Sequence, residues 1–167
     1  GEEGFVAAYN EEIAAITAEG RLKQEIELPP EESAPPADPR ALQGPRAAED
    51  DPAYRDWLRT VDPQKQSGFA AVTIKLDRGD VSSTQFDQLA ELVEVFADGT
   101  LRTANNQNLI VRWIRTGALP HLFARLQEIG LAEAGSNTIH DVVSCPAADT
   151  CNLAVTSSMS LAKHLTR

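Results

Sequence analysis

The apolar residues of the chain recur either every third or fourth position or in alternation with other residues. Spacing of three and four predicts three helices, over residues 4–19, 82–99 and 116–130. Ser82 and Gln85 form the signature of a capping box at the start of the second helix. Gly99 and Gly130 stand where the second and third helices are expected to end.

Alternating apolar positions predict the strands. The predicted strands cover residues 69–76, 109–114 and 139–143, with a short strand near 100–103 that pairs with the third. The order strand, helix, strand, strand, helix, strand favours an α+β fold, the ferredoxin-like split βαβ sandwich with its helices on one face of an antiparallel sheet. An N-terminal helix, a proline-rich arm and a C-terminal helix complete the predicted fold.

The proline-rich arm separates the first helix from the predicted sandwich. Residues 29–52 contain seven of the ten prolines, mixed with Glu, Ser, Ala and Gly, and such a composition buries little apolar surface. We therefore expect a linker or an extended arm that follows the surface. Tyr54, Trp57 and Leu58 lie at helical spacing directly after it and predict a short helical turn whose aromatic rings anchor the arm on the domain.

Charge and hydropathy restrict the classes of function. The net charge is −10, and residues 1–60 hold fourteen acidic and six basic side chains. This balance argues against a nucleic-acid or anionic membrane partner, because either would require clustered Lys and Arg. The sequence has neither an apolar run of membrane-spanning length nor a signal-peptide pattern, so we expect a cytoplasmic location, where structural disulfides are rare.

Cys145 and Cys151 are the only cysteines of the chain and have five residues between them. The apolar positions Leu153, Met159 and Leu165 predict a last helix, and the two cysteines are expected to lie on either side of its start, where thiol pKa values are lowered. The pair is compatible with a disulfide, a reversible thiol switch, half of a metal site or two structural cysteines. A zinc site is disfavoured because the three histidines are not at ligand spacing.

Four blocks of residues carry a resemblance to a known family. The blocks are residues 63–68 (PQKQSG), 101–109 (LRTANNQNL), 129–131 (IGL) and 145–154 (CPAADTCNLA). In this order, the stretch from Phe69 to Leu165 resembles the second of two internal repeats of the sirohaem-dependent nitrite and sulfite reductases. The resemblance implies segments of 1–28 (N-terminal helix), 29–60 (arm with a short helix), 61–144 (ferredoxin-like half-domain) and 145–167 (start of the domain that binds 4Fe-4S and sirohaem).

The same resemblance implies a site. Cys145 and Cys151 would be the first two metal ligands of a 4Fe-4S cluster, Gln107 would contact sirohaem, and Asn106 and Asn108 would flank it. In this family a later C-x3-C pair supplies the other two ligands, and nitrite or sulfite is reduced by six electrons at sirohaem. The implied partners are the rest of the same polypeptide and an electron donor such as ferredoxin or a flavoprotein.

Three departures from the family pattern qualify the function that the resemblance implies. Ala104 stands where the family often has a second Thr, Ala147 stands where Gly is common, and the sequence ends before any C-x3-C pair. We therefore expect a fragment of a nitrite or sulfite reductase, inactive and without bound cofactor when isolated, with no catalytic residue of its own. The alternatives are a stand-alone ferredoxin-like interaction module with structural cysteines, or a part of a protein similar to precorrin-3B synthase.

Overall fold

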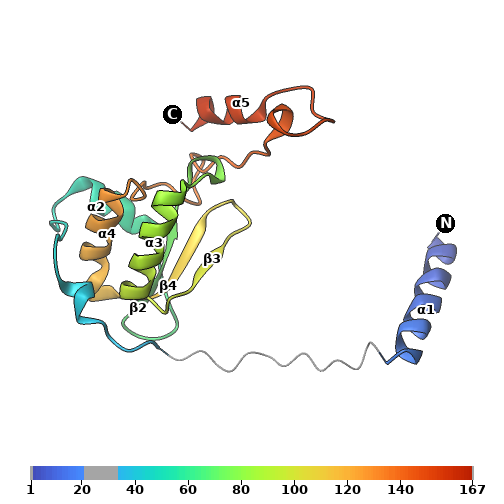
Figure 1. Ribbon diagram of the computed structural model, residues 1–167, viewed down its shortest axis with the longest axis horizontal. Helices are drawn as coiled ribbons and strands as arrows, with labels where there is room; N and C mark the ends of the chain where they lie inside the picture. Colours follow the sequence, from blue (N-terminus) through green and yellow to red (C-terminus); the bar gives the residue numbers. More distant parts are fainter. Residues whose placement is uncertain (1, 21–33, 167) are drawn as a thin grey trace. The chain divides into compact units, whose positions relative to one another are not determined.

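The computed structural model describes residues 2–20 and 34–166 of the chain. It contains two compact units, Gly1–Ser33 and Ala34–Arg167. In the first unit α1 runs from Glu2 to Ala18 (Figure 1), which confirms the predicted helix at residues 4–19. Its aromatic residues Phe5 and Tyr9 stack with their ring centroids 6.4 Å apart and are exposed. The predicted structure of residues 21–33 lies outside the described residues.

Four strands form the sheet of the second unit. They are β1 (Val61–Pro63), β2 (Phe69–Ile74), β3 (Leu101–Thr103) and β4 (Leu109–Arg115). The strand order is β1-β2-β4-β3, and every neighbouring pair is antiparallel. Ala70, Val72 and Ile74 of β2 are all buried, as the alternating pattern predicts. The α+β ferredoxin-like class is confirmed.

The predicted strand over residues 139–143 is wrong. This segment forms no strand, and Ile139 is 88% exposed. The edge of the sheet beside β2 is instead taken by β1, which pairs Val61 with Val72. The short strand β3 pairs with β4 and not with residues 139–143. Because Asp141 bonds to the backbone of Asn137 and Thr138, this segment turns where a strand was expected.

The helices α3 (Ser83–Phe96) and α4 (Leu119–Glu128) cover one face of the sheet (Figure 1). The capping box is present: the Ser82 hydroxyl accepts from the Gln85 backbone N–H, and the Gln85 side chain accepts from the Ser82 backbone N–H. Short 3-10 helices are η2 (Pro39–Leu42), η3 (Leu58–Thr60), η4 (Asp77–Gly79), η5 (Thr116–Ala118) and η6 (Ala147–Asp149). Within residues 2–20 and 34–166, every helix is too short or too polar to cross a membrane.

The described part of the proline-rich arm follows the surface of the domain and is anchored by aromatic residues. The Ala47 backbone N–H donates to the Pro120 carbonyl at 3.0 Å. The helix α2 (Pro52–Trp57) places Tyr54 and Trp57 in the core, each with its ring centroid 5.3 Å from that of Phe123. Trp57 is completely buried. The predicted anchor is therefore confirmed.

The last helix is shorter than predicted. Helix α5 runs from Ser158 to Leu165, and Leu153, which was expected to contribute to its apolar face, is 93% exposed in the preceding segment. The Ser157 hydroxyl accepts from the Ser160 backbone N–H, which sets the start of the helix. Both cysteines therefore precede α5, and the prediction that they lie on either side of its first residue is wrong.

Candidate functional site

The loop between β3 and β4 carries four amide side chains, among them the predicted site residues Asn106, Gln107 and Asn108. The loop closes through a bond from the Ala104 backbone N–H to the Asn108 carbonyl at 2.9 Å and another from the Gln107 N–H to the Ala104 carbonyl at 3.2 Å. Gln107 has a φ of +64°, a left-handed conformation that turns the chain back into β4. The three predicted cofactor-binding residues thus share one tight hairpin loop.

Gln107 binds the backbone directly before the first cysteine. Its Nε2 donates to the Ser144 carbonyl at 2.9 Å, and its Oε1 accepts from the Ser144 N–H at 3.2 Å. A Cβ atom at Gly79 would lie 3.0 Å from the Gln107 Cβ, so a glycine there lets η4 approach this side chain. One amide therefore uses both of its polar atoms to fix the position of Ser144.

Asp141 collects three hydrogen bonds on one carboxylate oxygen. Its Oδ2 accepts from Asn108 Nδ2 at 2.7 Å, from the Asn137 backbone N–H at 2.8 Å and from Asn106 Nδ2 at 3.2 Å. Asn108 is only 1% exposed, and its Oδ1 accepts from the Leu76 N–H at 2.9 Å. Asn106 and Asn108 thus tie the hairpin loop to residues 137–141, and their contact with sirohaem stays a prediction.

Asp141 was missed as a site residue because it was assigned to a strand. The signal that could have revealed it is the run Gly135-Ser-Asn-Thr, whose side chains commonly bond to nearby backbone and form turns. Thr138 does so here, since its hydroxyl donates to the Gly135 carbonyl at 2.6 Å. The amide partners of Asp141 lie more than thirty residues away in sequence and gave no local signal.

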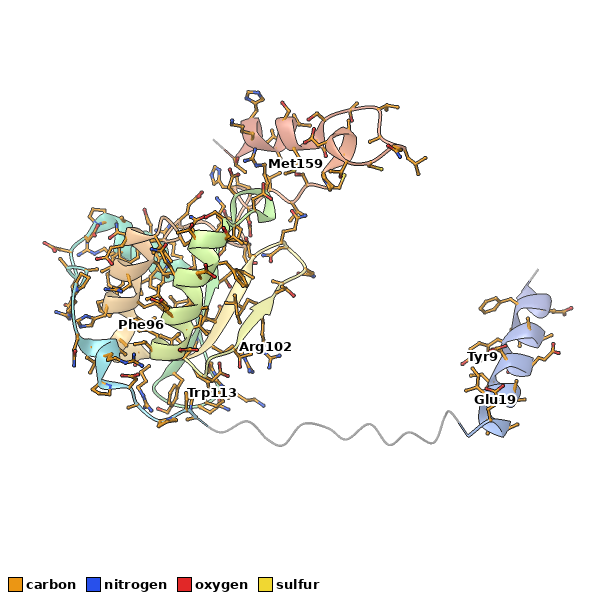
Figure 2. All side chains as sticks on the ribbon, in the orientation of Figure 1. Tyr9, Glu19, Phe96, Arg102, Trp113 and Met159 are labelled. Carbon is orange, nitrogen blue, oxygen red and sulfur yellow. The ribbon has the colours of Figure 1, made fainter. Side chains whose placement is uncertain are left out.

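Cys145 and Cys151 are free thiols, both exposed, at the two ends of the segment 145–151, which we call the cysteine turn. The Ser158 hydroxyl lies 3.5 Å from the Cys145 Sγ and 2.6 Å from the Cys145 carbonyl, and its single hydrogen can be donated to either. The Ser158 hydroxyl and the Ala147 backbone hold the pKa of the Cys145 thiol below its usual range. Beside them the Ser144 hydroxyl donates to the sulfur of Met159 on α5 at 3.1 Å (Figure 2).

The backbone of Ala147 closes the cysteine turn through two hydrogen bonds. Its carbonyl accepts from the Cys151 N–H at 2.8 Å and from the Thr150 N–H at 3.2 Å, so the backbone of the second cysteine bonds back to the start of the turn. Ala147 itself is buried and has a φ of +46°, in the left-handed region that favours glycine. The glycine that is common at this position in the family would relieve that strain.

The two thiols fit part of a metal or cluster ligand set. Thiolates are the usual ligands of iron–sulfur clusters, and the lowered pKa of the Cys145 thiol favours the thiolate. In the described part of the chain, no three His, Cys, Asp or Glu side chains are grouped so that they could hold a metal ion. Among residues 34–166, the pair would thus offer two ligands to such a site.

Comparison with known proteins identifies the domain. Residues 62–129 match the family model of the Nitrite/Sulfite reductase ferredoxin-like half domain. The chloroplastic ferredoxin–nitrite reductase of Zea mays is 28% identical over 128 residues, which are 73% of this chain and 22% of that protein. The corresponding enzyme of Betula pendula is 35% identical over 81 residues, which are 46% of this chain and 14% of that protein.

A sulfite reductase component also matches this chain. The sulfite reductase [NADPH] hemoprotein beta-component of Nitrosomonas europaea is 28% identical over 104 residues, which are 61% of this chain and 17% of that protein. The chain spans about a fifth of the length of the curated relatives it matches. The sheet topology and the family match define a ferredoxin-like half-domain. These matches support membership of the nitrite/sulfite reductase family, with the half-domain at residues 62–129.

Proposed function

We propose that this chain is part of a nitrite or sulfite reductase in which Cys145 and Cys151 supply two thiolate ligands of a 4Fe-4S cluster next to sirohaem. The observation that carries the proposal is the bonding of the Asn106–Asn108 loop to the backbone directly before Cys145. A half-domain loop that fixes the backbone next to an exposed thiol is what a ligand at the edge of a cofactor site requires.

The residues have separate roles in this proposal. Gln107 fixes Ser144, and Ser158 lies against the Cys145 thiol and favours its deprotonated form. The bound cofactors would supply the multi-electron chemistry. Each amide nitrogen carries two hydrogens, and Gln107 uses one of them on Ser144. Its second hydrogen is suited to donate to a carboxylate of the macrocycle, which makes Gln107 the best candidate of the three amides for that contact.

Asn106 and Asn108 are less suited to direct contact. Asn106 Nδ2 already donates to two acceptors, Asn137 and Asp141, and its buried Oδ1 has no partner in the described part of the chain. That oxygen is an acceptor and cannot bind a carboxylate. Asn108 is buried between Leu76 and Asp141. We therefore assign these two residues to positioning the loop.

The proposal is tested with the complete reading frame that contains this sequence, expressed anaerobically in a host that makes sirohaem. We expect reduction of nitrite or of sulfite by a chemically reduced viologen dye, and the preferred anion identifies the substrate. The purified 167-residue chain should show neither sirohaem absorbance nor a stable cluster, because two thiolates leave half of the cluster irons without protein ligands. Both cofactors at full occupancy in the isolated chain would contradict the proposal.

The second candidate, a ferredoxin-like interaction module with structural cysteines, has one observation in its favour. Both thiols are exposed and no third ligand lies near them among residues 34–166. This candidate predicts that the complete protein contains no iron and that Cys145→Ser changes no measured property. Iron and acid-labile sulfide in the complete protein would exclude it.

A further inference from the structure

The first described residues of the proline-rich arm, 34–39, cross the domain over an apolar cavity, and we call these residues the strap. The cavity has a volume of about 330 Å³, and its floor on the domain side includes Phe96, Ala97, Trp113 and Ala118. A second hollow of about 480 Å³ is lined by the strap, the end of α3 and the turn after it. None of the residues of the cysteine turn lines either of them, so this region is separate from the proposed cofactor site.

The sequence of the strap makes it an extended, polyproline-type segment. A residue that precedes proline is restricted to the β and polyproline II regions, and this applies to Ala34, Pro35 and Asp38. Asp38 accordingly has a φ of −92° and a ψ of 121°. Polyproline II has about three residues per turn, so residues three positions apart share a face. Pro35 and Asp38 are half-buried and Pro36 and Ala37 are exposed, so the first two face the domain.

A distortion of β4 gives the cavity an aromatic floor. Between Ala70 and Val72 of β2 the register against β4 shifts, and Trp113 has a φ of +63°, which is an outlier for a bulky aromatic residue. A β-bulge of this kind re-aims one side chain, and Trp113 and Ile114 are both buried although they are neighbours in a strand. The ring of Trp113 therefore lines the cavity together with that of Phe96 (Figure 2).

Arg115 binds the backbone of the strap. Its guanidinium packs over the Phe69 ring at 4.9 Å, and its Nη2 donates to the Pro35 carbonyl at 3.0 Å. In the described part of the chain, this exposed bond joins the strap to the sheet. Grooves lined by aromatic rings are the surfaces on which proteins bind proline-rich segments, because polyproline II is extended before it binds and loses little entropy. The domain thus binds the strap by its extended conformation and its backbone.

The strap leaves the cavity unfilled at Asp38. The Asp38 side chain is 24% exposed and lines the apolar cavity, but its Oδ2 lies 2.6 Å from Arg40 Nη2 and its Oδ1 accepts from the Arg40 backbone N–H at 2.8 Å. The carboxylate is therefore paired within the strap and adds no apolar contact to the floor. A large apolar side chain at this position would bury apolar surface that Asp38 does not cover.

We propose that this surface is a docking site for a proline-rich segment of another polypeptide, and that the strap occupies it in cis. The preferred segment has the pattern Pro-Pro-x-apolar-Pro, which places a large apolar side chain where the strap has Asp38. Arg115 binds a backbone carbonyl of this segment, and its apolar side chain fills the cavity. The segment competes with a tethered strap, whose effective concentration is in the millimolar range. The site is separate from the cysteine turn, so the proposal does not depend on the reductase function.

The test titrates three peptides into the ¹⁵N-labelled full chain and follows the backbone amide signals of Ala97, Gly117 and Ala118, which line the cavity. The peptides are APPADPRAL, which is residues 34–42, APPALPRAL, which has leucine in place of the aspartate, and AAAALPRAL, which also lacks the two adjacent prolines. We expect saturable shifts with the first two peptides, with the leucine peptide bound at least about fivefold more tightly. The third peptide should give no saturable shift.

Variants of the chain separate the strap from the surface beneath it. The double variant Pro35→Gly and Pro36→Gly makes the strap flexible, and we expect it to bind the leucine peptide at least about threefold more tightly than the unmodified chain does. Arg115→Ala is added to this double variant, because in the unmodified chain it would weaken the strap and the peptide alike. It should weaken the peptide at least about fivefold, whereas Arg59→Ala, at an 82% exposed side chain, should have no effect.

Three results would overturn the proposal. The first is the absence of saturable shifts at these amides in the double glycine variant up to about 2 mM peptide, which is the range of the effective concentration of a tethered segment. The second is equal affinity for the leucine and alanine peptides, or an unchanged affinity after Arg115→Ala. The third is a concentration-dependent dimer of the unmodified chain in sedimentation that the double glycine variant loses, because the occupant would then be the arm of a second copy.

Discussion

Replacement of Asp141 by alanine tests the connection between the hairpin loop and the cysteine turn. The substitution removes the acceptor of three hydrogen bonds, of which the bond from Asn108 is the most buried. Leaving the Asn108 amide unsatisfied costs about 1–3 kcal/mol, and the more exposed donors of Asn106 and Asn137 regain water and add about 0.5 kcal/mol each. We expect the free energy of unfolding to fall by about 2–4 kcal/mol.

The assay is urea denaturation followed by circular dichroism, with Asp149→Ala as the matched control because Asp149 is exposed and makes no side-chain bond in the described structure. The control should change stability by less than about 0.5 kcal/mol. Asp141→Asn retains one side-chain oxygen and should lose about half as much as Asp141→Ala. Equal stabilities of Asp141→Ala and Asp149→Ala would refute the reasoning, because the carboxylate would then contribute nothing to the loop.

Three further predictions concern the cysteine turn and the arm. Because the pKa of the Cys145 thiol is lowered, its alkylation by iodoacetamide should reach half its maximal rate below about pH 8.5, and Ser158→Ala should move that midpoint upward. Ala147→Gly should slow exchange of the amide hydrogens in the turn, because glycine removes the strain of a left-handed alanine, which is about 1 kcal/mol, and Ala148→Gly should leave the exchange unchanged. Trp57→Ala should lower the free energy of unfolding by about 3–5 kcal/mol because the ring is completely buried.

Each of these predictions has a control and a contradicting result. Ser160→Ala, on the same helix, should leave the pH midpoint of alkylation unchanged. An unchanged midpoint in Ser158→Ala would show that the Ser158 hydroxyl does not lower the pKa of the Cys145 thiol. Faster exchange in Ala147→Gly than in the original protein would show that the left-handed conformation carries no strain. Leu42→Ala, at a 60% exposed position, should cost little, and an equal loss from both truncations would contradict the anchor.

The parts of the fold that depend on local signals were predictable. The capping box of Ser82 and Gln85 marks the start of α3, and the spacing of Tyr54 and Trp57 marks the anchor, because both patterns involve residues within one turn of helix. The alternation of Ala70, Val72 and Ile74 predicts a strand with one buried face. Such patterns involve residues that are close in sequence, and the folded chain has the local structure that they predict.

The predictions were wrong or incomplete where the structure depends on contacts between segments that are far apart in sequence. Residues 139–143 were expected to form an edge strand, but β1 is the edge strand beside β2 in the structure. Strand β1 is too short and too polar to be predicted from the sequence. The network around Asp141 joins residues 33 and 35 positions apart, so no local pattern indicates it. The positive φ of Trp113 could not be predicted either, because the residue type does not favour that conformation and only the register of β2 against β4 requires the bulge.

The central claim is that Cys145 and Cys151 are cluster ligands. Its most direct test is the iron and acid-labile sulfide content of the complete protein, purified anaerobically, with each cysteine replaced in turn by serine and with Ser160→Ala as the control. The proposal predicts that both cysteine variants lose at least about nine tenths of the labile sulfide, since the cluster would keep only three of its four thiolates, while Ser160→Ala retains it. A full complement of sulfide in either cysteine variant would contradict the claim.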